Sequence, residues 1–201
     1  MTLLLLVTLG CIFGGDDDAP TDDSKADSDP QETEAPDPQE LDDERVRNLD
    51  LSQLPAEGNP CAEPALVRVE TVIDGDTAWV DPQAGGADFK VRLIGIDAPE
   101  LSHNGDPAEC YSSESGGYFQ DLAQGDLVWL TFGNQCTDTY DRTLAYAHKD
   151  IGETGFVNRV MVRQGYAWAY PFDDNNDFKK DFQADEDAAR AEGLGMWGAC
   201  D

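Results

Sequence analysis

Short runs of alternating apolar and polar residues dominate positions 65–148, and this two-residue period is typical of half-buried β-strands. In the first run, Val67, Val69 and Thr71 fall on one face. Asp74-Gly75 follows as a strong hairpin turn signal. The pattern predicts five strands, at residues 65–73, 76–80, 89–96, 127–132 and 142–148.

Three other segments carry apolar residues at helical spacing, and they predict helices over residues 112–124, 155–164 and 177–192. The second and third end before Gly165 and Gly193, as helices commonly do. Five short strands with three helices indicate an α+β domain. Strands of this number and length suit a closed five-stranded β-barrel of the OB-fold type.

Composition and charge divide the chain into two parts. The chain has 201 residues and a net charge of -29, and its hydrophobic fraction of 40% excludes a wholly disordered protein. That charge argues against non-specific nucleic-acid binding, which usually needs a basic surface. The argument stays open because charge is unevenly placed: residues 12–60 hold 16 acidic and three basic residues. We therefore predict an acidic disordered linker over 12–60 and a folded domain over 61–201.

Residues 1–11 form a separate segment. The apolar run that continues to Phe13 is shorter than the about 20 residues that span a bilayer. It resembles the core of a secretory signal, and Gly10-Cys11 resembles the lipidation site of a bacterial lipoprotein. We expect an exported protein, held at the membrane of the bacterial cell envelope by a lipidated Cys11. The alternative is ordinary secretion in which Cys11 is removed.

Four further cysteines lie in the predicted domain: Cys61, Cys110, Cys136 and Cys200. An even number in an exported protein indicates two disulfides, and four cysteines allow three pairings. A zinc site is the competing interpretation, but no C-x-x-C or H-x-x-x-H spacing supports it.

Charged residues among the apolar strands gather in three clusters, at residues 72–77, 91–100 and 140–146. Singly, each is explained by a turn, a loop entry or a strand edge. Together, Asp-Gly-Asp-Thr, Arg-Leu-Ile-Gly-Ile-Asp-Ala-Pro-Glu and Tyr-Asp-Arg-Thr-Leu-Ala-Tyr resemble the staphylococcal nuclease (thermonuclease) family in order and spacing. The ending Gly-Leu-Gly-Met-Trp, to Trp197, is similar to the family's terminal motif. The resemblance covers about residues 65–199 and implies an OB-fold barrel with three helices.

The resemblance also implies a metal site. It assigns Asp76 and Asp97 as carboxylate ligands, joined by the carbonyl oxygen of Ala98 and by water. Ca²⁺ suits such a set, because it tolerates irregular all-oxygen coordination better than Mg²⁺.

Further roles follow from the same resemblance. Glu100 corresponds to the family's glutamate that orients or deprotonates the attacking water, and Arg92 and Arg142 correspond to the arginines that hold the scissile phosphate. Tyr140 and Tyr170 correspond to aromatic substrate contacts. For Tyr170, a plain core tyrosine is the alternative.

This sequence departs from the family in its lysines. Thr139 stands where a phosphate-binding lysine is usual, and residues 101–109 contain Asp106 and Glu109 instead of lysines, so we expect weaker polyanion binding. The topology that the resemblance implies pairs Cys110 with Cys136 and Cys61 with Cys200.

Two functions remain. The main hypothesis is a monomeric Ca²⁺-dependent nuclease that hydrolyses DNA, RNA or both with little sequence preference. The alternative is a non-catalytic OB-fold module that binds nucleic acid or a protein, which the acidic surface would favour.

Overall fold

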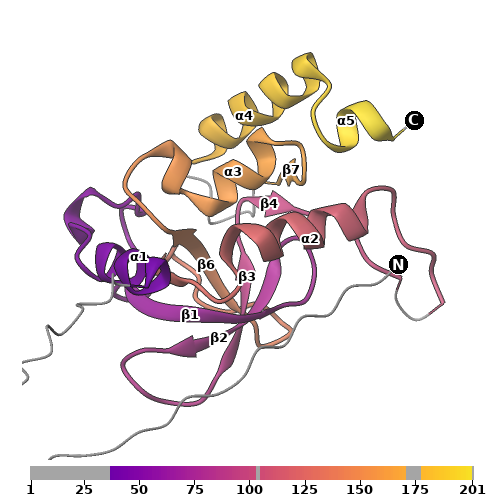
Figure 1. Cartoon of the computed structure of the whole chain (residues 1–201). Helices are drawn as coiled ribbons and strands as arrows, with labels where there is room; N and C mark the ends of the chain where they lie inside the picture. The colour runs from indigo at the N-terminus through magenta and orange to yellow at the C-terminus, as the bar shows by residue number, and fades with distance from the viewer. Residues whose placement is uncertain (1–36, 103–104, 171–177, 201) are drawn as a thin grey trace, which may run out of the picture. The chain divides into compact units, whose positions relative to one another are not determined.

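The computed structural model describes residues 37–102, 105–170 and 178–200. A closed barrel forms its centre, with strand order β1-β2-β3-β6-β5 (Figure 1). Neighbouring strands are antiparallel except β3 and β6, which are parallel. The predicted five-stranded OB-type barrel is therefore confirmed. Its strands are β1 (Ala65–Val72), β2 (Thr77–Pro82), β3 (Phe89–Leu93), β5 (Leu127–Thr131) and β6 (Thr143–His148).

The alternating pattern explains the barrel. Inward positions such as Val69, Val80 and Leu130 are buried, whereas Glu70 is exposed. A register shift between Val69 and Thr71 in the β1–β2 pairing ends the strict alternation there, so the prediction that Thr71 shares the face of Val67 and Val69 is wrong and Thr71 is exposed. Helix α2 (Ser112–Ala123) adds Phe119 and Ala123 to the same core. Removing this apolar surface from water stabilises the fold by about 25 cal/mol for each Å² buried.

The predicted third strand, residues 89–96, is interrupted. β3 ends at Leu93, and after a turn the short strand β4 (Ile96–Asp97) pairs with β7 (Trp168–Ala169) outside the barrel. Gly95 permits the turn because its φ is 79° and a Cβ there would lie 2.3 Å from the ring of Phe182. The chain thereby leaves the barrel just before Asp97, a residue of the candidate site.

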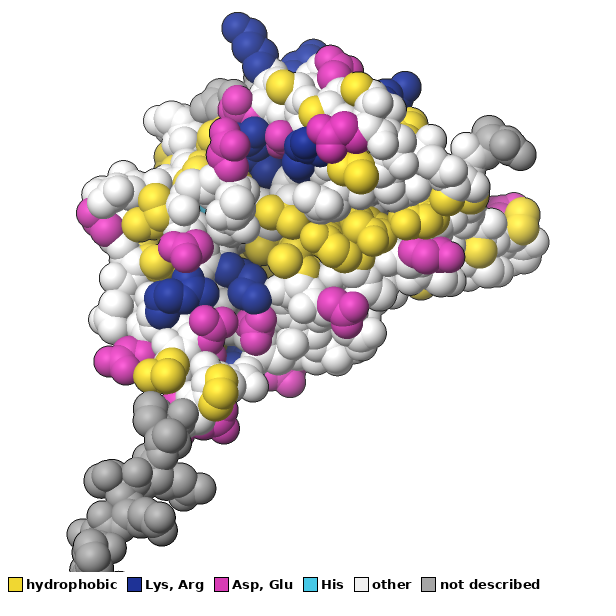
Figure 2. Space-filling model, turned by 45° about the horizontal axis from the view of Figure 1, so that its top comes forward, with side chains coloured by type: hydrophobic (Ala, Val, Ile, Leu, Met, Phe, Trp, Pro, Cys, Tyr) yellow, Lys and Arg dark blue, Asp and Glu magenta, His cyan; other side chains and the backbone are white. Residues whose placement is uncertain are grey.

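All three predicted helices are present, as α2, α3 (Val157–Arg163) and α4 (Lys179–Glu192). Figure 1 shows α3 and α4 stacked above the barrel, and Arg159 joins them through Asp185, with nitrogen–oxygen distances of 2.6 and 2.9 Å. In the space-filling view, basic side chains on this face lie beside acidic ones rather than forming a separate basic patch (Figure 2). Two 3₁₀ turns, η1 (Leu51–Gln53) and η2 (Glu153–Gly155), and the short helix α5 (Met196–Ala199) complete the part after residue 50.

A further helix, α1 (Pro38–Arg47), lies within the segment expected to be a disordered linker. Val46 is buried, and its carbonyl oxygen accepts a hydrogen bond from Nε1 of Trp129 in β5 at 2.8 Å. Arg45 forms an ion pair with Asp150 at 2.7 Å. The prediction of disorder is therefore wrong for residues 37–60, because tertiary contacts supply what the local sequence lacks. Residues 12–36 and Cys11 lie outside the described residues. No helix in the described ranges has the length and apolar character to cross a membrane.

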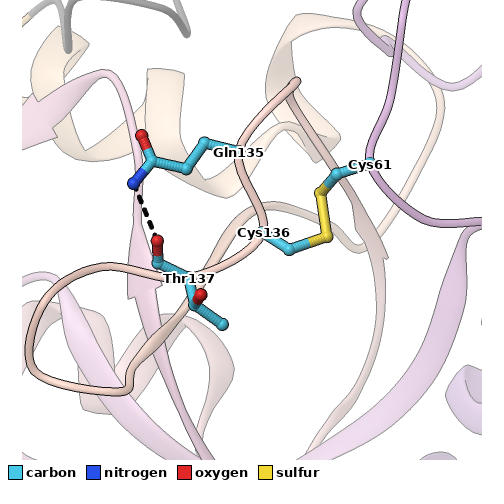
Figure 3. The surroundings of a disulfide bond; sticks show 4 residues. All are labelled: Cys61, Gln135, Cys136 and Thr137. Carbon is cyan, nitrogen blue, oxygen red and sulfur yellow. Dashed lines mark hydrogen bonds between the residues drawn. A yellow bond between two sulfur atoms is a disulfide. The ribbon is translucent and has the colours of Figure 1, made fainter.

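The predicted disulfide pairing is also wrong. The structure pairs Cys61 with Cys136 and Cys110 with Cys200, with Cα–Cα distances of 5.6 and 6.0 Å. The ordered N-terminal segment explains the difference, since the backbone N–H of Cys61 donates to the carbonyl of Gly133 at 2.7 Å and so brings Cys61 to the β5–β6 loop. Figure 3 shows the Cys61–Cys136 bond, together with the hydrogen bond that Gln135 donates within that loop.

We expect the Cys61→Ser/Cys136→Ser double variant to lose about 2–4 kcal/mol of unfolding free energy, because the bond closes a long loop in the unfolded chain. Urea denaturation measures this loss. Peptide mapping of the non-reduced full chain checks the pairing itself: a peptide linking Cys61 to Cys136 is expected, and one linking Cys110 to Cys136 would contradict the structure.

His148 predicts a pH dependence of stability. Its ring is fully buried, with Nε2 2.9 Å from Oγ1 of Thr131, and burial lowers its pKa to about 3. The unfolded chain binds a proton at this ring near pH 6.5 and the folded chain does not. The contribution of the neutral ring to the free energy of unfolding is therefore fully present above pH 6.5 and declines as the pH falls toward 3. Between pH 7.5 and 4.5, the wild type should lose about 2–3 kcal/mol more than His148→Gln in urea denaturation. Parallel stability curves for the two proteins would contradict this assignment.

Candidate active site

The turn between β1 and β2 carries the first site residue, Asp76. Its backbone N–H donates to Oδ1 of Asp74 at 3.0 Å, which shapes the turn. Gly75 lies against α2, where a Cβ would come 1.9 Å from Oγ of Ser115. Only glycine therefore allows this turn to pack under the helix, and the packing leaves Asp76 just 4% exposed. Oδ2 of Asp76 accepts from the backbone N–H of Ala98 at 2.8 Å.

Arg92 is at the centre of the site. It extends from β3, is 4% exposed, and donates through Nε to Oδ1 of Asp76 at 2.9 Å and through Nη2 to Oδ1 of Asp97 at 2.8 Å. Its Nη1 donates to the carbonyl oxygens of Leu93 and Ile96. The structure thus brings together three residues that the sequence assigned to one site, from the β1–β2 turn, β3 and β4.

Carboxylates crowd this arginine. Burial raises the pKa of Asp76, Asp97 and Glu100. The charge of Asp74 raises each of these pKa values further, and Glu109 adds to the shift at Asp97 and Glu100. Two carboxylates thus pair with the guanidinium, and Asp74, Glu100 and Glu109 lie close enough for their charges to act within the same cluster, so the cluster has an excess of negative charge that a bound cation would offset.

The donor chemistry of the cluster fits a hard divalent cation. Asp97 has a side chain that is 42% exposed and can reach solvent or a bound ion, while Asp76 lies behind it. Across the described ranges, no group of three or more His, Cys, Asp or Glu side chains is arranged as a complete metal site. Further ligands would therefore come from backbone carbonyl oxygen, such as that of Ala98, and from water, which Ca²⁺ accepts readily.

Glu100 is exposed at the edge of the cluster and its position is fixed by Glu109. The backbone N–H of Glu100 donates to Oε2 of Glu109 at 2.9 Å, and the N–H of Glu109 donates to the Glu100 carbonyl at 2.9 Å. Sequence reasoning noted Glu109 only as a negative charge. No spacing in the sequence signals this contact, because the two glutamates are nine positions apart and meet only through the path of the loop between them.

Arg142 lies apart from the cluster in its described contacts. Its Nε donates to Oδ2 of Asp138 at 2.7 Å, and its guanidinium carbon is 5.4 Å from the ring centre of Tyr140, which is 80% exposed. Arg142 directly precedes β6, which pairs with β3 through Thr143 and Val91, so it comes from the strand next to that of Arg92. Asp138 was missed by sequence reasoning, because it lies in the loop before β6 and no local pattern signals its contact with Arg142.

The remaining predicted substrate contact, Tyr170, is 49% exposed, and its backbone N–H donates to the carbonyl of Gly95 at 2.8 Å. This bond places Tyr170 directly after β7, beside the turn that leads to Asp97. Residues 171–177, which follow Tyr170, lie outside the described residues.

A closed barrel with an arginine held between two aspartates at its edge defines an OB-fold protein with a site suited to a metal ion and a phosphate. Comparison with family models matches residues 90–199 to "Staphylococcal nuclease homologue". The chain therefore belongs to the staphylococcal nuclease family, as its motifs predicted.

Curated relatives agree. "Thermonuclease" of Staphylococcus intermedius is 30% identical over 129 residues, which cover 64% of this chain and 74% of the relative. An "Uncharacterized endonuclease" of Haemophilus influenzae is 34% identical over 147 residues, covering 73% and 71%. "Endonuclease YhcR" of Bacillus subtilis is 30% identical over 138 residues, which cover 64% of this chain but only 11% of that much longer protein.

Proposed function

We propose that this protein is a Ca²⁺-dependent nuclease that hydrolyses phosphodiester bonds of DNA, RNA or both with little sequence preference. Family membership supports the reaction class, and the three relatives described above are named as nucleases. The observation that carries the proposal is the buried Arg92, whose guanidinium joins Asp76 and Asp97 beside an exposed Glu100.

Each residue has a chemical task in this proposal. Asp76, Asp97 and the Ala98 carbonyl would hold the cation, which when bound would neutralise a phosphate oxygen. Glu100 would orient the attacking water and accept its proton, and its raised pKa brings it closer to the range in which a general base works well at neutral pH. Arg92 would donate to the phosphate as negative charge develops there.

Arg142 and Tyr140 would complete the phosphate contacts from the β5–β6 loop. Guanidinium is suited to this because it stays charged and offers several fixed donors. The Asp138 carboxylate holds Arg142 at 2.7 Å, and the Cys61–Cys136 bond ties the same loop to the N-terminal segment. Substrate would therefore meet a loop that is already positioned, with the exposed Tyr170 available for a stacking contact.

Location and assembly are part of the proposal. Two disulfides suit an oxidising compartment outside the cytoplasm, in agreement with the expected signal segment and lipidated Cys11. The protein would act as a monomer at the bacterial cell envelope or in secreted form. Labelling with a lipid precursor would distinguish the anchored form from the secreted form. If Cys11 carries the lipid, the wild type incorporates the label and Cys11→Ser does not.

A cleavage assay with the full chain tests the activity. Denatured DNA and RNA are incubated with the wild type in Ca²⁺ or in EDTA across a series of salt concentrations, alongside Glu100→Ala and Arg142→Ala. We expect Ca²⁺-dependent cleavage that both substitutions reduce strongly. Absence of Ca²⁺-dependent cleavage, or variants as active as the wild type, would favour the non-catalytic binding module instead.

A further inference from the structure

The outer face of β3 carries a second cation close to Arg92. Lys90 lies two residues before Arg92 on this strand and is exposed, whereas Val91 between them is 2% exposed and belongs to the barrel core. Because successive side chains of a strand alternate between its faces, Lys90 and Arg92 both extend outward, about 6.5–7 Å apart along the strand. Lys90 lies on the side of Arg92 away from Asp97, which follows Arg92 in the chain.

Trp79 of the neighbouring strand β2 holds Lys90. The two residues pair in register, so their side chains emerge on the same face of the sheet. The Trp79 side chain is 39% exposed, and Nζ of Lys90 lies 5.2 Å from the centre of its ring. This cation–π contact restrains an otherwise flexible side chain and leaves the N–H groups of the ammonium available to another partner.

The ammonium of Lys90 has no acidic partner, although the chain has 42 acidic and 13 basic residues. Most described arginines, and Lys149, form ion pairs with carboxylates, whereas no described carboxylate oxygen lies within ion-pair distance of Nζ of Lys90. Beyond Lys90, acidic residues follow on both strands, at Asp81 near the end of β2 and at Asp88 just before β3. The cationic part of this face is therefore long enough for one anionic group beyond the one at Arg92.

A phosphate is the anion that this arrangement fits. An ammonium binds a phosphate oxygen as a compact charge with three donors. The two-residue step of about 6.5–7 Å from Arg92 to Lys90 is close to the separation of neighbouring phosphates in an extended single strand. A strand whose scissile phosphate lies at Arg92 would therefore bring the phosphate of its next linkage to Lys90.

We propose that Lys90 forms a second phosphate-binding subsite, which contacts the substrate phosphate next to the scissile one. The inference rests on the proposed nuclease function and extends the substrate from one linkage to a longer strand that follows the outer face of β3. Lys90 contacts the backbone and no base, so the subsite adds affinity without sequence preference. Trp79 is a positioning residue that acts through Lys90.

The salt dependence of binding tests this subsite. Full-length protein in EDTA is titrated into an end-labelled single-stranded octamer at about 0.05–0.2 M salt, and binding is followed by fluorescence anisotropy. We expect Lys90→Ala to weaken binding about two- to fivefold at the lowest salt. The slope of log affinity against log salt should fall by about 0.7 in magnitude, as expected for the loss of one phosphate contact on a single strand. The control is Lys180→Ala, which removes an exposed lysine of α4 and should leave affinity and slope at the wild-type values.

Variants of Trp79 separate its positioning role from a general effect on the barrel. Trp79→Leu should weaken octamer binding about twofold, and Trp79→Phe, which keeps an aromatic face for the ammonium, should retain most of the wild-type affinity. In a Lys90→Ala background, Trp79→Leu should have no further effect, because it acts through Lys90. An undiminished effect in that background would overturn the role of Trp79.

Unchanged affinity and slope in Lys90→Ala would overturn the subsite, as would a wild type that does not bind the octamer at about 0.05 M salt. An equal loss of slope in Lys180→Ala would show an effect of total charge, which also contradicts the proposal. Cleavage of the same octamer in Ca²⁺ is measured separately. If the wild type does not cleave while the Lys90-dependent binding persists, the nuclease function is rejected and the subsite stands. If the wild type cleaves while Lys90→Ala binds as the wild type does, the nuclease function stands and the subsite is rejected.

Discussion

Replacing Arg92 with alanine is expected to lower the free energy of unfolding by about 3–5 kcal/mol, because it leaves a buried carboxylate without its partner. Asp76 is 4% exposed, and Nε of Arg92 lies 2.9 Å from its Oδ1. Any nuclease activity should fall at least about 100-fold as well, since the same guanidinium is proposed to contact the phosphate. Urea denaturation at pH 7.5 measures the first effect, and cleavage of denatured DNA measures the second.

Two comparison variants separate the buried ion pair from a general loss of charge. Lys90→Ala removes an exposed cation two residues earlier on the same strand, whose Nζ lies 5.2 Å from the centre of the Trp79 ring, and should change stability by at most about 1 kcal/mol. The double variant Asp76→Asn/Arg92→Ala also removes the unpaired charge and should recover part of the lost stability. A loss below about 1 kcal/mol in Arg92→Ala, or no recovery in the double variant, would contradict this role for Arg92.

Replacing Glu100 with glutamine is expected to lower kcat about 10²–10⁴-fold, the range typical for loss of a general base. Stability should stay within about 0.5 kcal/mol, because the Glu100 side chain is exposed and its hydrogen bonds to Glu109 use backbone atoms and the Glu109 carboxylate. KM should change little, because glutamine keeps the size of the side chain. Steady-state cleavage of single-stranded DNA in Ca²⁺ separates the two constants.

Glu70→Gln serves as the matched control for Glu100→Gln, since Glu70 is an exposed glutamate on β1 and the substitution removes the same charge. It should cleave at the wild-type rate. If Glu100→Gln keeps more than half of the wild-type kcat, or if both variants lose activity equally, Glu100 is not the base.

The barrel could be predicted because its signals are local. β1 buries alternate positions at Val67 and Val69, β5 and β6 bury most of their positions, and the Asp74-Gly75 turn is compatible with only a few backbone conformations. The break in the third strand was missed, because Ile94 and Ile96 continue the apolar run across it. Only the packing of Phe182 against Gly95 reveals why the chain turns there.

The N-terminal part could not be predicted for a different reason. Helix α1 has many charged residues and buries only Val46 among its own side chains, so its sequence carries no apolar stripe. Its stability comes from partners more than 80 residues away, such as Trp129 and Asp150. The incorrect disulfide pairing followed from the same omission, because the position of Cys61 depends on the path of this segment.

Within the site, motif reasoning found the residues but not the supports that hold them. Asp76, Arg92 and Asp97 are brought together as expected. Glu109 and Asp138, which fix Glu100 and Arg142, lie in loops whose geometry no local pattern encodes. The same loops are where this chain lacks the lysines that are usual in the family. Two acidic residues in these loops, Glu109 and Asp138, instead hold Glu100 and Arg142 in place.

Only part of the acidic charge behind the net value of -29 would repel a negatively charged ligand. Arg159 and Arg190 pair with Asp185 and Glu186, so part of the acidic charge stabilises helix contacts rather than repelling a ligand. The remaining excess at the site favours a cation. We therefore expect substrate affinity to depend on Ca²⁺ more than on low salt.

Calorimetric titration of Ca²⁺ tests the central claim, a cation site at the carboxylate cluster, most directly. The full-length wild type is compared with Asp97→Asn and with Asp88→Asn, whose aspartate is exposed in the β2–β3 turn, at about 0.15 M salt to screen diffuse binding. The account predicts saturable binding of Ca²⁺ in the wild type and Asp88→Asn, and its loss in Asp97→Asn. Saturable binding of equal affinity in Asp97→Asn, or none in the wild type, would contradict it.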